Sequence, residues 1–174
     1  GDTVALPAGA PRMLSLTALG EVPEGQRVPS RAGARPGDRL FVSGPVGDAG
    51  AGLALLMDGA TEPPELIRAY RVPMPHLTLG QSLAPGAHAM MDVSDGLLID
   101  AARMAEASDC AIEIDHVPLS EAYAALRGES VVARLAAATA GDDYVLLAAL
   151  APQQEPIRGL IEVGRCKEGE GLSV

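Results

Sequence analysis

Apolar residues recur along this chain at two spacings, which predict short strands interleaved with short helices. Alternating or continuous apolar runs predict strands over residues 13–19, 39–43, 87–91, 111–114, 144–150 and 160–163. Apolar positions three and four residues apart predict helices over residues 49–57, 64–70, 77–83, 94–107, 118–127 and 131–139. Because strands and helices interleave from end to end, the predicted fold class is α/β (α+β).

An acidic turn is predicted where the apolar run 87–91 gives way to the helical pattern that follows it. Asp92, Ser94, Asp95 and Gly96 fall in this turn. Carboxylates there offer hard oxygen ligands for Mg²⁺ beside the positive end of a helix dipole. The alternative is that Ser94 or Asp95 simply caps the helix. Asp92 favours the metal site, because a cap does not require it and burying a lone carboxylate at a strand end is costly; Gly96 would let a phosphate or metal approach the backbone.

Two other clusters are candidates for binding. Asp142 and Asp143 follow Gly141 and precede the predicted strand 144–150. They could form an ordinary polar turn, or they could hold a second metal or a cationic group of a substrate. Arg31 belongs to a group of arginines around a Gly-containing turn; such residues are usually solvated, but an arginine there could also bind a phosphate through two hydrogen bonds.

Composition narrows the classes of function. The chain has 174 residues, 48% of them apolar, and a net charge of −10. It has no Trp and one Phe, so stacking platforms for nucleic acid are nearly absent, and the charge repels nucleic acid and anionic membranes. The three His are far apart, which argues against a zinc site, and the two cysteines, Cys110 and Cys166, are expected to be buried, reduced thiols. We therefore expect a cytoplasmic protein with no nucleic-acid or membrane partner.

The motifs occur in an order that resembles the thiamine-monophosphate kinase family, within the aminoimidazole-ribonucleotide synthetase-like superfamily. The matching segments are Gly1-Asp2-Thr3, Arg31-Ala32-Gly33-Ala34-Arg35-Pro36-Gly37-Asp38, Val42-Ser43-Gly44-Pro45-Val46-Gly47, Arg71-Val72-Pro73-Met74-Pro75, Asp92-Val93-Ser94-Asp95-Gly96-Leu97 and Gly141-Asp142-Asp143-Tyr144. The resemblance implies the C-terminal domain of the synthetase-like fold, a mixed sheet packed with helices. Residues 1–24 would hold a trailing strand of the N-terminal domain and residues 25–174 the C-terminal domain, with both ends of the chain cut from something longer.

The resemblance also implies a function. It is the Mg²⁺-dependent transfer of the ATP γ-phosphoryl group to thiamine monophosphate, giving thiamine diphosphate, in a protein that forms a homodimer when intact. The implied residues are Asp2, Asp92 and Asp95 for Mg²⁺, Gly1, Asp2, Arg31 and Ser94 for ATP, and Asp142 for the substrate. Asp142 is one methylene shorter than the family's Glu, and Val145 replaces the next Glu.

Two alternatives to this function remain open. One is a different ATP-dependent synthetase of the same superfamily. The other is a non-catalytic lobe that binds Mg²⁺ or a partner protein. In each case the chain by itself is expected to be an incomplete enzyme.

Overall fold

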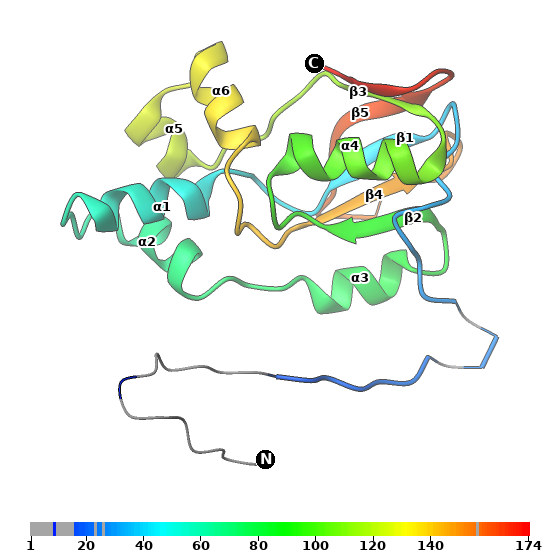
Figure 1. Cartoon of the computed structure of the whole chain (residues 1–174), viewed down its shortest axis with the longest axis horizontal. Helices are drawn as coiled ribbons and strands as arrows, with labels where there is room; N and C mark the ends of the chain where they lie inside the picture. The colour runs from blue at the N-terminus through cyan, green and yellow to red at the C-terminus, as the bar shows by residue number, and fades with distance from the viewer. Residues whose placement is uncertain (1–8, 10–15, 23, 26, 156) are drawn as a thin grey trace.

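The computed structural model describes residue 9 and residues 16–22, 24–25, 27–155 and 157–174 (Figure 1). Helices and strands interleave within these residues, which confirms the mixed α and β class. The elements are β1 (Arg39–Val42), α1 (Asp48–Met57), α2 (Pro64–Arg71), α3 (Leu77–Leu83), β2 (Ala87–Asp92), α4 (Leu97–Ser108), β3 (Ala111–Ile114), α5 (Glu121–Arg127), α6 (Val131–Ala138), β4 (Leu146–Leu150), β5 (Ile161–Lys167) and β6 (Gly171–Ser173).

The strands form one six-stranded mixed sheet in the order β2-β4-β1-β5-β3-β6. Neighbouring strands are antiparallel, except that β3 and β6 are parallel. In the pairing of β2 with β4, Asp92 lies opposite Leu146. The last residue of β2 is therefore beside the first residue of β4, and the loops that leave these two ends must meet.

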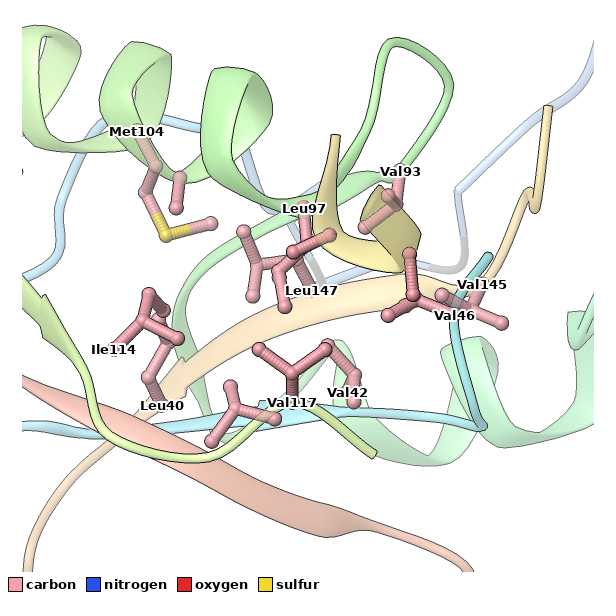
Figure 2. Close-up of a cluster of buried hydrophobic side chains, with 14 of the residues drawn as sticks. Leu40, Val42, Val46, Val93, Leu97, Met104, Ile114, Val117, Val145 and Leu147 are labelled. Atoms are coloured by element: carbon pink, nitrogen blue, oxygen red, sulfur yellow. The ribbon is translucent and has the colours of Figure 1, made fainter. Parts of the chain in front are cut away.

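Helix α4 covers one face of the sheet, and α3 lies on the other side (Figure 1). Strand residues alternate between the two faces, so Leu40 and Val42 join the α4 side, whereas Phe41 packs on the other face with Leu83 of α3. Figure 2 shows the α4 side, where Leu97 and other apolar side chains from the helix meet those of the strands. Nearly all of this core is aliphatic, as expected for a chain with four aromatic side chains.

The remaining helices gather beyond one end of the sheet, where α1 packs against α2, α5 and α6 (Figure 1). The approach of α1 to α2 is close because Gly52 has no side chain: a Cβ there would be 2.0 Å from the carbonyl oxygen of Leu66. Helices α5 and α6 begin at serine caps, Ser120 and Ser130, whose side chains accept the peptide N–H groups of Tyr123 and Ala133.

Several predicted boundaries are wrong for local reasons. Helix α4 starts at Leu97 rather than residue 94, because the acidic turn occupies the residues before it. Strand β5 continues to Lys167, beyond the predicted end at residue 163; its outward charges pair across the sheet, as Lys167 does with Glu113 at 2.6 Å. Strand β6 was not predicted, since a three-residue element carries too little pattern. Of the predicted strand 13–19, residues 16–19 form no strand and residues 13–15 lie outside the described residues.

Candidate functional site

Two acidic loops lie side by side at one end of the sheet. Residues 92–96 leave β2, and residues 139–145 lead into β4. Three backbone hydrogen bonds join them: Tyr144 N–H donates to the Val93 carbonyl at 2.8 Å, Val93 N–H to the Val145 carbonyl at 2.8 Å, and Asp142 N–H to the Ser94 carbonyl at 2.9 Å. The two acidic motifs of the sequence are therefore one structural unit. Val93 and Val145, both buried, anchor that unit in the core (Figure 2).

Glycines permit this close contact between the loops. A Cβ on Gly141 would be 2.7 Å from the Ser94 carbonyl oxygen, and one on Gly96 would be 3.0 Å from the Ala140 carbonyl oxygen. Gly96 also has φ 106°, which side-chain-bearing residues rarely adopt. The sequence suggested that Gly96 admits a phosphate or metal to the backbone; in the structure it admits the backbone of the neighbouring loop.

The three carboxylates predicted for binding lie on this unit. Asp92 and Asp95 are exposed, and Asp142 is half-buried. Within the described residues no donor lies within hydrogen-bonding distance of the Asp92 carboxylate, whereas Asp95 pairs with Arg103. The expectation that Asp92 is a buried charge is wrong: its carboxylate faces solvent at the end of β2.

Asp142 and Tyr144 have the left-handed backbone conformation, with φ of 67° and 53°. This conformation is unusual for a tyrosine, and such strain persists where surrounding contacts enforce it. The Tyr144 hydroxyl donates to Asp142 Oδ1 at 3.3 Å. The negative charge of Asp142 is the main reason that the pKa of Tyr144 is raised, and Asp92 and Asp95 add to it. These carboxylates therefore share one negative field.

Neither Ser94 nor Asp95 caps α4, so the capping alternative is wrong. The N-cap position is Gly96, which has no side chain to cap with. Asp100 in the first turn of α4 reaches back instead: its Oδ2 accepts the peptide N–H groups of Ser94 and Asp95, each at 2.9 Å. The structure buries Asp100 completely.

Asp143 points away from the other carboxylates and caps α1. Its Oδ2 accepts the N–H of Gly47 at 2.6 Å and its Oδ1 the N–H of Ala49 at 3.2 Å. The side chain is half-buried, and this desolvation raises its pKa to about 6 against these two hydrogen bonds. Asp48 is the first residue of this helix and accepts the Ser120 hydroxyl at 2.7 Å. Of these adjacent carboxylates, Asp142 therefore belongs to the acidic unit, whereas Asp143 caps a helix.

Arg31 follows the edge strand β2 towards the C-terminal end of α4. The carbonyl of the preceding Ser30 accepts Met90 N–H at 2.9 Å, and the Arg31 carbonyl accepts the Ser108 hydroxyl at 3.1 Å. Its side chain is exposed. Gly1 and Asp2, the other predicted contacts of ATP, lie outside the described residues.

The donor set fits a hard divalent cation more than any other ligand. Asp92, Asp95 and Asp142 supply oxygens alone, which suits Mg²⁺. Among the described residues no three acidic, His or Cys side chains form a complete metal centre. The carboxylates of this unit could thus contribute part of a coordination shell, with nucleotide oxygens and water as the remainder.

No described helix combines the length and the apolar character needed to cross a membrane. The cysteines Cys110 and Cys166 are free and buried, as expected. Burial raises the pKa of the Cys166 thiol to about 12, so it is inert at neutral pH.

Comparisons with other proteins agree with this architecture. The family model for AIR synthase related protein, C-terminal domain, matches residues 35–171. Thiamine-monophosphate kinase of Caulobacter vibrioides is 38% identical, over 99% of this chain and 53% of that protein. The crystal structure of thiamine-monophosphate kinase from Stenotrophomonas maltophilia K279a matches 87% of this chain and 54% of its own, with 35% identity and a TM-score of 0.78.

A further similar structure is AaThiL complexed with AMPPCP and TMP, at 38% identity and a TM-score of 0.73, covering 82% of this chain and 48% of that one. The chain thus spans about half the length of the curated relatives that it matches. The resemblance drawn from the ordered motifs is confirmed: this chain belongs to the family of AIR synthase related protein C-terminal domains.

Proposed function

We propose that this chain is the C-terminal domain of a thiamine-monophosphate kinase, which transfers the γ-phosphoryl group of ATP to thiamine monophosphate and releases thiamine diphosphate and ADP. The observation that carries the proposal is the junction of the two acidic loops. The hydrogen-bonded residues are 48 or more positions apart in the chain, the nearest pair being Ser94 and Asp142, yet these bonds hold the two loops together as one unit. The relatives named thiamine-monophosphate kinase and the AaThiL complex with AMPPCP and TMP support the choice of reaction.

The proposed roles of the residues follow their chemistry. Asp92 and Asp95, with Asp2, would hold Mg²⁺; Ser94 and Arg31, with Gly1 and Asp2, would contact ATP. Donor and acceptor are both anionic phosphates, and bound Mg²⁺ would neutralise their charge and align them. The exposed Asp92 carboxylate, which accepts no hydrogen bond from the described residues, supports a role in binding a cation.

Asp142 would contact the thiamine monophosphate. Its carboxylate accepts the Tyr144 hydroxyl, which orients it, and the left-handed backbone at both residues fixes the direction of the loop. An anionic carboxylate is suited to the cationic thiazolium ring of the substrate, as in any contact between opposite charges at short range. It need not transfer a proton, because phosphoryl transfer depends mainly on position and charge.

The remaining parts of the proposal concern the full-length protein. Residues 25–174 would form the C-terminal domain, which contains the matched residues 35–171, and residues 1–24 the end of the N-terminal domain. We further propose that the full-length protein is a cytoplasmic homodimer. It would bind neither nucleic acid nor anionic membranes, because the net charge of −10 repels both.

The test is an assay of the full-length protein with ATP, Mg²⁺ and thiamine monophosphate, following thiamine diphosphate by chromatography. We expect turnover, and we expect Asp92→Asn to lower it by more than about 100-fold, beyond the loss typical of residues that only support a metal ligand. The matched control is Asp58→Asn, at the exposed end of α1, which should retain wild-type turnover. The 174-residue chain alone should phosphorylate thiamine monophosphate at a rate far below the roughly 1–100 s⁻¹ that is typical of kinases.

Other results would assign another function. Turnover of a formylglycinamidine or of selenide, without turnover of thiamine monophosphate, would place the protein with other ATP-dependent enzymes of the superfamily. Absence of any heat on titrating the chain with Mg²⁺ and a non-hydrolysable ATP analogue, before and after Asp92→Asn, would favour a non-catalytic lobe.

A further inference from the structure

Asp100 is a fully buried carboxylate that no motif assigned to the site. It lies in the first turn of α4, with 0% of its surface exposed. Its Oδ2 accepts two peptide N–H groups, those of Ser94 and Asp95, at 2.9 Å each. Its Oδ1 accepts Arg103 at 3.0 Å. A single side chain thus bonds two consecutive peptide groups of the acidic turn and a guanidinium group.

A buried charge of this kind is costly unless donors compensate for it. Three donors compensate here, and all of them belong to the acidic turn or to the helix behind it. Its neighbours on α4, Leu97, Ala101 and Met104, are apolar residues of the core. The carboxylate is therefore better explained by what it holds than by the packing of α4.

The hydrogen bonds of Asp100 also decide which ligand the turn can take. Peptide N–H groups before a helix commonly bind phosphate. In this turn the N–H groups of Ser94 and Asp95 are already occupied by a carboxylate, so they are closed to an anion. What the turn presents to solvent is the carboxylates of Asp92 and Asp95, which attract a cation.

We propose that Asp100 is a positioning residue: by holding the peptide groups of Ser94 and Asp95, it directs Asp92 and Asp95 outward as a cation-binding pair. Asp100 touches neither cation nor substrate itself. The proposal rests on the proposed function, in which Asp92 and Asp95 are the residues that bind Mg²⁺.

The test compares Mn²⁺ binding, as a paramagnetic probe for the Mg²⁺ site, in the full-length protein and its variants by electron paramagnetic resonance, with a non-hydrolysable ATP analogue present. Asp100→Leu removes all three hydrogen bonds and should weaken Mn²⁺ binding by about 10- to 100-fold, the range for residues that orient metal ligands. Asp100→Asn keeps one acceptor, which can still bind both peptide N–H groups, and should recover part of that affinity. Asp92→Asn should abolish Mn²⁺ binding both alone and in combination with either Asp100 variant.

Two further measurements separate positioning from a general loss of structure. The amide resonances of Ser94 and Asp95 should shift upfield in Asp100→Leu, and their protons should exchange faster with solvent, while amides in β4 and β5 stay protected.

The matched control is Asp38→Asn, which alters another buried aspartate, one that is bonded to His88 at 2.9 Å and lies outside the acidic loops. It should lower thermal stability without changing Mn²⁺ affinity. If Asp100→Leu does not fold, Asp100→Asn decides the question by the same readouts.

The possible failures are distinguishable. Tight Mn²⁺ binding by Asp100→Leu and Asp100→Asn, with loss of binding in Asp92→Asn, overturns the positioning role and leaves the proposed function standing. Equal binding by the wild type and Asp92→Asn, or no binding by either, overturns both.

Discussion

The two acidic loops hold their carboxylates in opposite ways. In the loop after β2, the carboxylates of Asp92 and Asp95 face outward, and the residue that holds the loop, Asp100, comes from the helix immediately following. In the loop before β4, Asp143 faces inward and caps α1 by bonding Gly47, 96 residues earlier in the chain. The first loop is organised by its own sequence neighbours, and the second by a distant part of the fold.

The two loops therefore contribute carboxylates to one surface although each is held in place by a different kind of contact. The first loop can place Asp92 and Asp95 with local hydrogen bonds alone. The second loop is held at Asp143 by its hydrogen bonds to Gly47 and Ala49, and the residues on either side of Asp143 have the left-handed backbone conformation. The carboxylates that could bind a ligand therefore depend on the buried Asp100 and the half-buried Asp143, neither of which would touch it.

The largest effect on the contact between the two loops is expected from Gly141→Ala, which forces them apart. The new Cβ would lie 2.7 Å from the Ser94 carbonyl oxygen, a backbone atom that cannot move without shifting the acidic turn. We expect the free energy of unfolding to fall by about 2–3 kcal/mol, the upper part of the range for volume added to a packed region. Urea denaturation measures this change, and Mn²⁺ binding should weaken with it.

Gly20→Ala is the matched control for that substitution, because a Cβ at Gly20 would meet no atom of the described residues within 4 Å. Its effect should stay within about 0.5 kcal/mol, as for most surface changes. An equal effect of the two substitutions would mean that contact between the loops contributes nothing to stability.

The inward carboxylate can be tested separately through pH. Burial raises the pKa of Asp143 to about 6 in the folded chain, from 3.8. Between these values the folded state keeps a proton that the unfolded chain releases, so this group's contribution to stability falls as pH rises from about 4 to about 6. Relative to Asp143→Asn, the wild type should therefore lose roughly 1–2 kcal/mol over this interval, since one pKa unit corresponds to about 1.4 kcal/mol and burial is incomplete.

The measurement is urea denaturation of both proteins from pH 4 to pH 7. Asp48→Asn, like Asp143→Asn, should reduce the loss of stability that the wild type shows as pH rises. The reason is that burial raises the pKa of Asp48, although the hydrogen bond from the Ser120 hydroxyl opposes the rise. A difference between wild type and Asp143→Asn that stays constant, or that grows with pH, would contradict the inward, desolvated placement of this carboxylate.

Most of the fold was predictable because its signals are local. The helical spacing of α4 and the apolar runs of β2, β3 and β4 identify these elements to within a few residues. Strand β6 was missed, because its three residues are held by parallel pairing with β3 rather than by any pattern of their own. The order of strands in the sheet was equally out of reach, since pairing between distant segments leaves no periodicity in the sequence.

The candidate site was predictable in part for the same reason. The placement of Asp92, Asp95 and Asp142 in turns next to β2 and β4 followed from residue type and position. The burial of Asp100 did not, because helical spacing alone cannot tell an exposed polar residue from a buried one that bonds the preceding turn. One signal was present: a carboxylate four residues after Gly96, in the first turn of a helix without a capping side chain. The role of Asp143 had no such signal, since its partners Gly47 and Ala49 are distant in sequence.

The smallest effect that separates the outward from the inward carboxylates concerns Arg103. This side chain bonds both Asp95, which is exposed, and Asp100, which is buried. A cation that binds Asp95 must compete with the guanidinium group, so Arg103→Gln should strengthen Mn²⁺ binding. Because exposed ion pairs contribute little, we expect a gain in Mn²⁺ affinity of roughly two- to fivefold.

Arg103→Lys keeps the positive charge and should match the wild type, which separates the effect of charge from that of shape. Titration of all three proteins with Mn²⁺ at low ionic strength measures the difference, and weaker binding by Arg103→Gln than by the wild type would show that Arg103 supports the acidic turn instead of competing for it.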